Sequence, residues 1–170
     1  MKTKNFLTTI IFLIGITISS FAQSFDCSLY TKVNYDAMEG YYYTTGLKSI
    51  IASDDNGKTG ILISMTEWEK SIILSIYAVG ASSCIDRDSK IIFLLEDNTI
   101  ITFYSKENFN CKNKATIYIG EFWKNTNSQS KLCNSYVKTI RVWTEEGYVE
   151  RNLDKENQIL FMNTMKCMSN

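Results

Sequence analysis

Residues 91–104, IIFLLEDNTIITFY, indicate the fold class of this chain. Two runs of aliphatic and aromatic residues flank Asp97-Asn98, and both of these residue types favour tight turns. The stretch therefore predicts a β-hairpin with a two-residue loop at Asp97-Asn98, in which opposed residues are equidistant from the loop. The expected pairs include Leu95 with Ile100 and Phe93 with Thr102.

Two cysteines lie beyond the arms of this hairpin, and Cys84 and Cys111 are equidistant from its turn. Opposed residues of antiparallel strands have Cα atoms about 4.5–5.5 Å apart, which a disulfide accepts. We therefore predict a Cys84–Cys111 disulfide, with two buried free thiols as the alternative. The other three cysteines, Cys27, Cys133 and Cys167, can supply at most one more disulfide. No predicted strand register indicates which two of them pair.

The rest of the chain after residue 40 repeats the same pattern of short β-rich runs separated by Asn, Asp, Gly and Ser. This spacing predicts an antiparallel meander or sandwich rather than βαβ units. The segment 124–131 (KNTNSQSK) is wholly polar and is expected to be a loop. The expected strands are residues 41–45, 48–52, 60–65, 72–79, 91–96, 99–104, 115–122, 136–144 and 148–153.

The last expected hairpin has two possible registers. A two-residue loop at Glu145-Glu146 gives favourable cross-strand pairs, whereas a three-residue loop that includes Gly147 places Arg141 opposite Arg151. We prefer the first register because it avoids that repulsion. Its pairs are Trp143 with Tyr148, Val142 with Val149, and Arg141 with Glu150.

One helix is predicted, over residues 154–168, with Asn152 or Asp154 as its cap. Apolar residues at helical spacing give it one face that packs on the sheet. The fold class expected is therefore mainly β (α+β): an antiparallel sheet or sandwich built of hairpins, with one C-terminal helix packed on it. The stripe consists of Ile159, Met162 and Met165, widened by Leu160, Phe161 and Met168.

Residues 1–22 have the three-part layout of a secretory signal peptide. Lys2 and Lys4 precede an apolar run over residues 6–18, and small residues at Ser20 and Ala22 predict cleavage after Ala22. The run is too short to span a bilayer, which takes about 20 residues. Residues 23–170 are then a single β-rich domain in the periplasm or outside the cell, with no membrane span. A lipid on Cys27 is disfavoured, because Ser24-Phe25-Asp26 does not resemble a lipidation signal.

Composition excludes several classes of function. The chain has no histidine, so Ser-His-Asp catalysis, Cys-His catalysis and His-ligated zinc are excluded. Its 18 basic and 18 acidic residues, with no basic run, argue against nucleic acid as a partner. Residues 54–57 (DDNG) are expected to be a tight turn rather than a calcium loop, because Lys58 replaces an oxygen ligand. No catalytic residue, metal or cofactor is predicted.

Exposed aromatic residues are the best candidates for ligand contact. Tyr41 and Tyr43 share one face of an expected strand, and Trp68 lies in a polar stretch, where rings could stack on sugars or peptides. The interpretation we favour instead places Tyr41 and Tyr43 in the core, with Trp68 shielding a sheet edge. Asp86 and Asp88 could form an acid/base pair, but a solvated connector is the preferred interpretation.

Part of the chain resembles small secreted proteins of Bacteroidota. The resemblance covers roughly residues 84–168, and the 21–23 junction (FAQ) is also typical of their signal peptides. It implies export and a shared architecture, and it carries no activity or site residues. The motifs that resemble that group are Cys84-Ile85-Asp86, Phe109-Asn110-Cys111, Ile140-Arg141-Val142, Tyr148-Val149-Glu150 and Lys166-Cys167-Met168.

Three functions are compatible with these observations. The first is an exported, non-catalytic β-rich module that binds a protein, or a small-molecule or glycan ligand, through its sheet or loops. The second is a secreted hydrolase that uses carboxylates alone, such as a glycosidase. The third is a subunit of a surface assembly that adds an edge strand to a neighbour.

Overall fold

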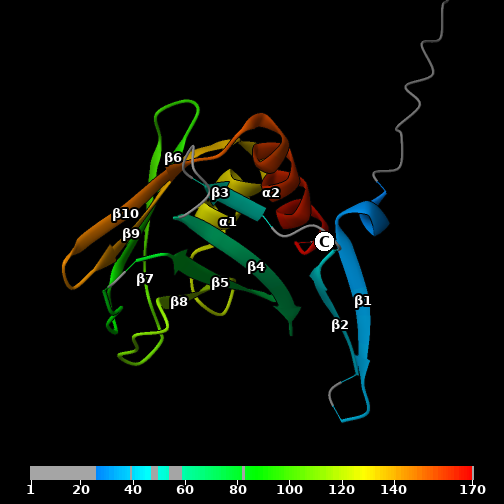
Figure 1. Cartoon of the computed structure of the whole chain (residues 1–170). Helices are drawn as coiled ribbons and strands as arrows, with labels where there is room; N and C mark the ends of the chain where they lie inside the picture. Colours follow the sequence, from blue (N-terminus) through cyan, green and yellow to red (C-terminus); the bar gives the residue numbers. More distant parts are fainter. Residues whose placement is uncertain (1–25, 39, 47–49, 54–58, 82, 170) are drawn as a thin grey trace, which may run out of the picture.

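The computed structural model describes residues 26–38, 40–46, 50–53, 59–81 and 83–169. Two antiparallel sheets and two helices enclose a shared core, and the C-terminal helix runs along the open side of the sheets (Figure 1). The mainly β architecture with a C-terminal helix is confirmed. The expected signal peptide, residues 1–22, and the turn at 54–57 lie outside the described residues. None of the helices in the described part of the chain is long and apolar enough to cross a bilayer.

The larger sheet has the order β1-β2-β4-β5-β8, with β3 paired to β4, and the smaller sheet has the order β10-β9-β6-β7. Each of the nine expected strands corresponds to an observed strand. The larger sheet comprises β1 (Thr31–Asp36), β2 (Gly40–Thr45), β3 (Ile50–Ser53), β4 (Gly60–Trp68), β5 (Ser71–Val79) and β8 (Lys114–Gly120). The smaller sheet comprises β6 (Lys90–Leu95), β7 (Ile100–Tyr104), β9 (Val137–Thr144) and β10 (Gly147–Asn152).

Two helices pack on these sheets, α1 (Thr126–Asn134) and α2 (Lys155–Cys167). The expected loop over 124–131 is wrong, because most of it forms α1. The expected helix over 154–168 is confirmed, and Asp154 caps it by accepting a hydrogen bond from the Asn157 amide at 2.8 Å. Ile159 is 36% exposed although it belongs to the expected buried stripe, because the buried face is centred on Phe161 and Met165.

The turn of the β6–β7 hairpin differs from the prediction by one residue. Asn98 has a φ of +64°, a left-handed conformation that Asn tolerates. The Leu95 amide donates to the Thr99 carbonyl at 2.9 Å, which makes a three-residue loop. The expected pairs Leu95 with Ile100 and Phe93 with Thr102 are therefore wrong. The observed pairs are Leu94 with Ile100 and Phe93 with Ile101.

The structure joins Cys84 to Cys111, the predicted pair, with Cα atoms 4.1 Å apart. A second disulfide joins Cys27 to Cys167 and ties the start of the described chain to the end of α2. Cys133 stays a free thiol in the core, where burial raises its pKa. It is therefore a poor nucleophile at neutral pH.

The β9–β10 hairpin has the preferred register, with Trp143 opposite Tyr148, Val142 opposite Val149 and Arg141 opposite Glu150. The Arg141 side chain donates to Glu150 at 2.6 Å. Its guanidinium also lies 4.3 Å from the centre of the Tyr148 ring. Both contacts stabilise the register that the charge pattern predicts.

Candidate functional site

Two clefts lie at the same end of the larger sheet, on opposite faces. Successive residues of β4 alternate between faces, so Glu67 lies on the core side and Trp68 on the outer side. Their cross-strand partners on β5 are Ile72 and Ser71 respectively, and Ile72 is fully buried. We call the outer hollow the aromatic cleft and the inner one the carboxylate cleft.

The aromatic cleft has a volume of about 220 Å³. Its rings are open to solvent, with Phe122 80%, Trp68 45% and Trp123 38% exposed. Exposed aromatic rings gathered in one concavity are typical of binding surfaces. The lining residues are Trp68, Glu69, Ser71, Ile73, Tyr118, Phe122 and Trp123.

The segment between β8 and α1 forms one wall of the aromatic cleft, and the Asn125 side chain holds it in place. Asn125 accepts a hydrogen bond from the Gly120 amide at 2.8 Å and donates to the Tyr118 carbonyl at 2.9 Å. These two bonds fold the chain back so that Trp123 stacks on Tyr118, with ring centres 4.7 Å apart. Phe122 meets Trp123 edge-on at 5.2 Å. The wall is therefore fixed by the protein before any ligand arrives.

The opposite wall is the β4–β5 turn. Glu69 and Lys70 have φ values of 47° and 62°, the paired left-handed conformation of a type I′ turn. Asn-Gly is the usual sequence there, so two charged residues with Cβ atoms are conformationally costly. Glu69 of this turn lines the cleft together with Trp68.

Gly120 joins the two walls, and replacing it with alanine is expected to lower the free energy of unfolding by about 2–3 kcal/mol. Its φ is +145°, and a Cβ there would lie 2.9 Å from the Lys70 carbonyl oxygen. Gly147→Ala is the matched control, because Gly147 has a φ of +144° with nothing within 4 Å of its added Cβ. Urea unfolding should show the larger loss for Gly120→Ala. Equal losses would mean that the close approach to β5 adds nothing.

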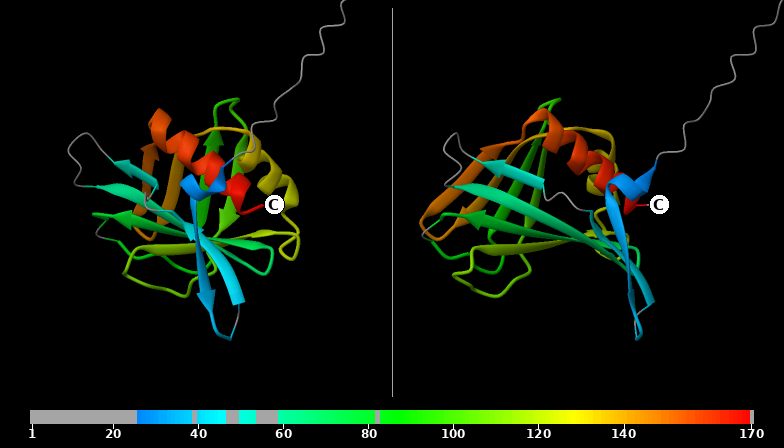
Figure 2. Two further views of the ribbon diagram at one scale, coloured as in Figure 1. Left: turned by 90° about the vertical axis from the view of Figure 1, so that its right-hand side faces the viewer. Right: turned by 45° about the vertical axis from the view of Figure 1, so that its right-hand side comes forward.

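The structure brings only one of the three predicted aromatic residues to this cleft. Trp68 lines it, whereas Tyr41 and Tyr43 lie on the opposite face of the sheet, on the β1–β2 hairpin. Their expected place in the core is wrong, since Tyr41 is 76% and Tyr43 39% exposed. The hairpin that carries them extends away from the helices and the smaller sheet (Figure 2).

Sequence reasoning missed the residues that complete the cleft. Tyr118 and Phe122 were expected only as strand residues, and Trp123 was not singled out. The one available signal was the Phe122-Trp123 pair directly before a polar segment, where a strand could no longer bury two large rings.

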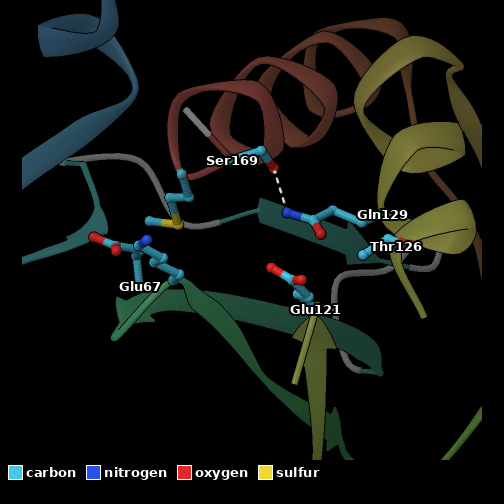
Figure 3. Close-up of a pocket in the computed structure, with 7 residues that line it drawn as sticks. Glu67, Glu121, Thr126, Gln129 and Ser169 are labelled. Atoms are coloured by element: carbon cyan, nitrogen blue, oxygen red, sulfur yellow. Dashed lines mark hydrogen bonds between the residues drawn. The ribbon is translucent and has the colours of Figure 1, made fainter. Parts of the chain in front are cut away.

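The carboxylate cleft, of about 310 Å³, lies between the sheet and the ends of both helices. Glu67 and Glu121 line it together with Lys70, Thr126, Gln129, Met168 and Ser169. Gln129 donates to the Ser169 hydroxyl at 3.1 Å. Figure 3 shows the Glu121 carboxylate directed into the space below Gln129, whereas the Glu67 carboxylate points away from it. The two acids therefore do not face a common point.

The other acidic residues considered from the sequence are structural. Asp86 accepts a hydrogen bond from the Arg87 amide at 2.7 Å, and Asp88 has a φ of +67° in an exposed turn. This agrees with the solvated connector. Elsewhere, the Lys114 ammonium donates to Glu107 at 2.7 Å and holds the pKa of that carboxyl below its usual range. Neither Glu107 nor Lys114 lines either cleft.

Among the described residues, no three Cys, Asp or Glu side chains cluster closely enough to hold a metal ion. Comparisons of the chain with protein-family models, with curated proteins and with solved structures find no match in any of the three.

Proposed function

We propose that this chain is an exported, non-catalytic binding module whose aromatic cleft binds a neutral glycan. The observation that carries the proposal is the gathering in one concavity of the exposed Trp68 ring and of Trp123 stacked on the half-buried Tyr118, with the wall held by the Asn125 side chain. A pyranose ring has one apolar C–H face, which stacks on an aromatic ring. Its hydroxyls then need polar partners at the edge of the stack.

Such polar partners stand beside the rings. The Glu69 carboxylate accepts hydrogen bonds, and the Ser71 hydroxyl both donates and accepts them. A further hollow of about 340 Å³ lies on the other side of the Tyr118–Trp123 pair, toward β7. One ring pair lining two adjacent hollows suits a ligand of several sugar units. Without Lys2 and Lys4 the exported form has 16 basic and 18 acidic residues, and this near-neutral charge favours a neutral ligand.

Export rests on the signal-like residues 1–22 and is supported by the cysteines. Two disulfides fit an oxidising compartment such as the periplasm or the extracellular space. The Cys27 sulfur is bonded to Cys167, so it is not available for a lipid thioether. Cleavage after Ala22 would release a form that keeps Cys27 and therefore both disulfides.

Replacing Trp68 or Trp123 with alanine should weaken glycan binding about tenfold or more, because each substitution removes a stacking surface. Trp143→Ala is the matched control, since Trp143 is 37% exposed and packs on Tyr148 outside the cleft. Binding is measured by calorimetry with cellohexaose, chitohexaose and laminarihexaose. Intrinsic tryptophan fluorescence should respond to the bound sugar in the Trp143→Phe variant and lose most of its response in the Trp68→Phe/Trp123→Phe double variant, which keeps only Trp143, outside the cleft. If none of the three sugars binds, the proposal of a neutral glucan or chitin ligand is wrong.

A secreted hydrolase is the second candidate, because Glu67 and Glu121 line one cleft. Carboxylate-only glycoside hydrolysis requires two acids that flank the same bond, and the divergence of these two side chains disfavours it. The test is the release of new reducing ends from the same oligosaccharides. If this activity is lost in Glu121→Gln and retained in Trp68→Ala, the protein is a hydrolase that acts at the carboxylate cleft.

A further inference from the structure

The β1–β2 hairpin presents an apolar face and an open strand edge. In the described residues β1 pairs on one side only, with β2, and its register runs without a bulge from Thr31–Thr45 to Asp36–Gly40. Figures 1 and 2 show this hairpin extending away from the core. The chain contains no proline, which commonly blocks such an edge.

One face of the hairpin carries a strip of exposed apolar side chains. Val33 lies opposite Tyr43, and Tyr35 lies opposite Tyr41 with ring centres 5.0 Å apart. All four side chains are exposed and project from the same side of the sheet. Contiguous exposed apolar surface of this kind usually marks an interface.

The backbone of β1 determines which residues can pair across the open edge. The Gly46 amide donates to the Tyr30 carbonyl at 2.8 Å. Because bonded and non-bonded pairs alternate along an antiparallel ladder, Lys32, Asn34 and Asp36 direct their backbone groups toward β2. Val33 and Tyr35 therefore direct their N–H and C=O groups outward.

We infer that β1 pairs antiparallel with β1 of a second copy, about a two-fold axis at Asn34. In this register Val33 lies opposite Tyr35 of the second copy, so the outward backbone groups meet as hydrogen-bonded pairs. Lys32 lies opposite Asp36 of the second copy, and the symmetry repeats both contacts. The strand sequence TKVNYD is thus complementary to itself in charge.

Other antiparallel registers lack this match. A shift of the register by one residue would place Val33 opposite a residue of the second copy whose backbone N–H and C=O groups point toward its own β2, so these hydrogen bonds could not form. A shift of the axis to Val33 or Tyr35 restores the backbone pairing but places Lys32 opposite a neutral residue. In the favoured register the two apolar strips also join, because Val33 contacts Tyr35 of the second copy on the face that carries Tyr41 and Tyr43.

Charge reversal tests this assignment. The exported chain should sediment as a dimer at micromolar concentration, and Lys32→Asp or Asp36→Lys should each raise the dimer dissociation constant about tenfold or more, because each places like charges opposite one another twice. The double variant K32D/D36K restores opposite charges and should regain most of the affinity. Lys138→Asp, an exposed strand lysine on β9, is the control and should leave the dimer unchanged.

Far-UV circular dichroism of each variant distinguishes a lost contact from a lost fold. The exposed position of Lys32 predicts an unchanged spectrum for Lys32→Asp. Asp36→Lys also removes the acceptor of the Met38 amide at 2.8 Å, so its spectrum shows whether the β1–β2 turn is kept. A monomeric wild-type chain overturns the assignment. A dimer that tolerates both single reversals also overturns it. Failure of the folded double variant to recover the dimer overturns the register centred on Asn34.

Discussion

Replacing Cys27 and Cys167 together with serine is expected to lower the free energy of unfolding by about 5 kcal/mol. The disulfide closes a loop of sequence separation 140, and the chain-entropy cost of the open unfolded chain grows with the logarithm of that length. A domain of this size has a total stability of about 5–15 kcal/mol, so the loss leaves a marginally folded chain. Urea unfolding without reductant measures it.

The second disulfide supplies a matched control for that prediction. Cys84–Cys111 has a separation of only 27, so its removal by two serines should cost about 3–4 kcal/mol. Both pairs should be removed in a Cys133→Ala background, because a free thiol could otherwise exchange with the remaining bond. A cost for the shorter loop that equals or exceeds that for the longer one would contradict the entropic explanation.

The Cys84–Cys111 pairing could be predicted from the sequence even though one step of the prediction was wrong. The three-residue turn at Asn98 shifts the β6–β7 register by one residue. Farther out, the Ser105 amide bonds the Ser89 carbonyl, and Ile85 then pairs with Asn110. The segment from Ser105 to Asn110 is one residue longer than the segment from Ile85 to Ser89. This extra residue cancels the one-residue shift in register before the chain reaches the cysteines. Because Cys84 and Cys111 are equidistant from Asp97-Asn98, their pairing was predicted correctly although the register of the strands between them was not.

The two missed elements bury few apolar side chains. β1 alternates polar and apolar residues, with Val33 and Tyr35 on one face, but these two side chains are exposed and only its first residue, Thr31, is buried. α1 buries Leu132 and Cys133, both in its last turn, and the rest of the helix is polar. α1 is held by contacts with α2 and β8, whereas β1 is held by its pairing with β2, the next strand along the chain.

The aromatic cleft was only partly predictable, because it combines residues 68–73 with residues 118–123. Trp68 could be recognised because it stands among charged residues at a strand end. Trp123 is placed by a local chain reversal after β8, in which Asn125 bonds back to Tyr118 and Gly120. A polar residue in a polar segment gives no sign of such a role.

Replacing Phe161 with alanine is expected to lower the free energy of unfolding by about 3–5 kcal/mol, the usual cost of truncating a fully buried Phe. Phe161 is completely buried, and its ring centre lies 5.8 Å from that of Phe93. Phe93 in turn meets Phe103 edge-on at 5.9 Å, so the three rings connect α2 to β6 and β7. Truncation would leave a cavity in the middle of this connection.

Ile159→Ala is the control, because it removes an apolar side chain from the exposed face of the same helix and should cost less than about 1 kcal/mol. Urea unfolding followed by circular dichroism compares the two variants. Similar losses for both would mean that α2 is not docked through Phe161. A loss confined to Phe161→Ala would establish that the aromatic connection holds the C-terminal helix on the smaller sheet, and with it the Cys167 end of the longer disulfide loop.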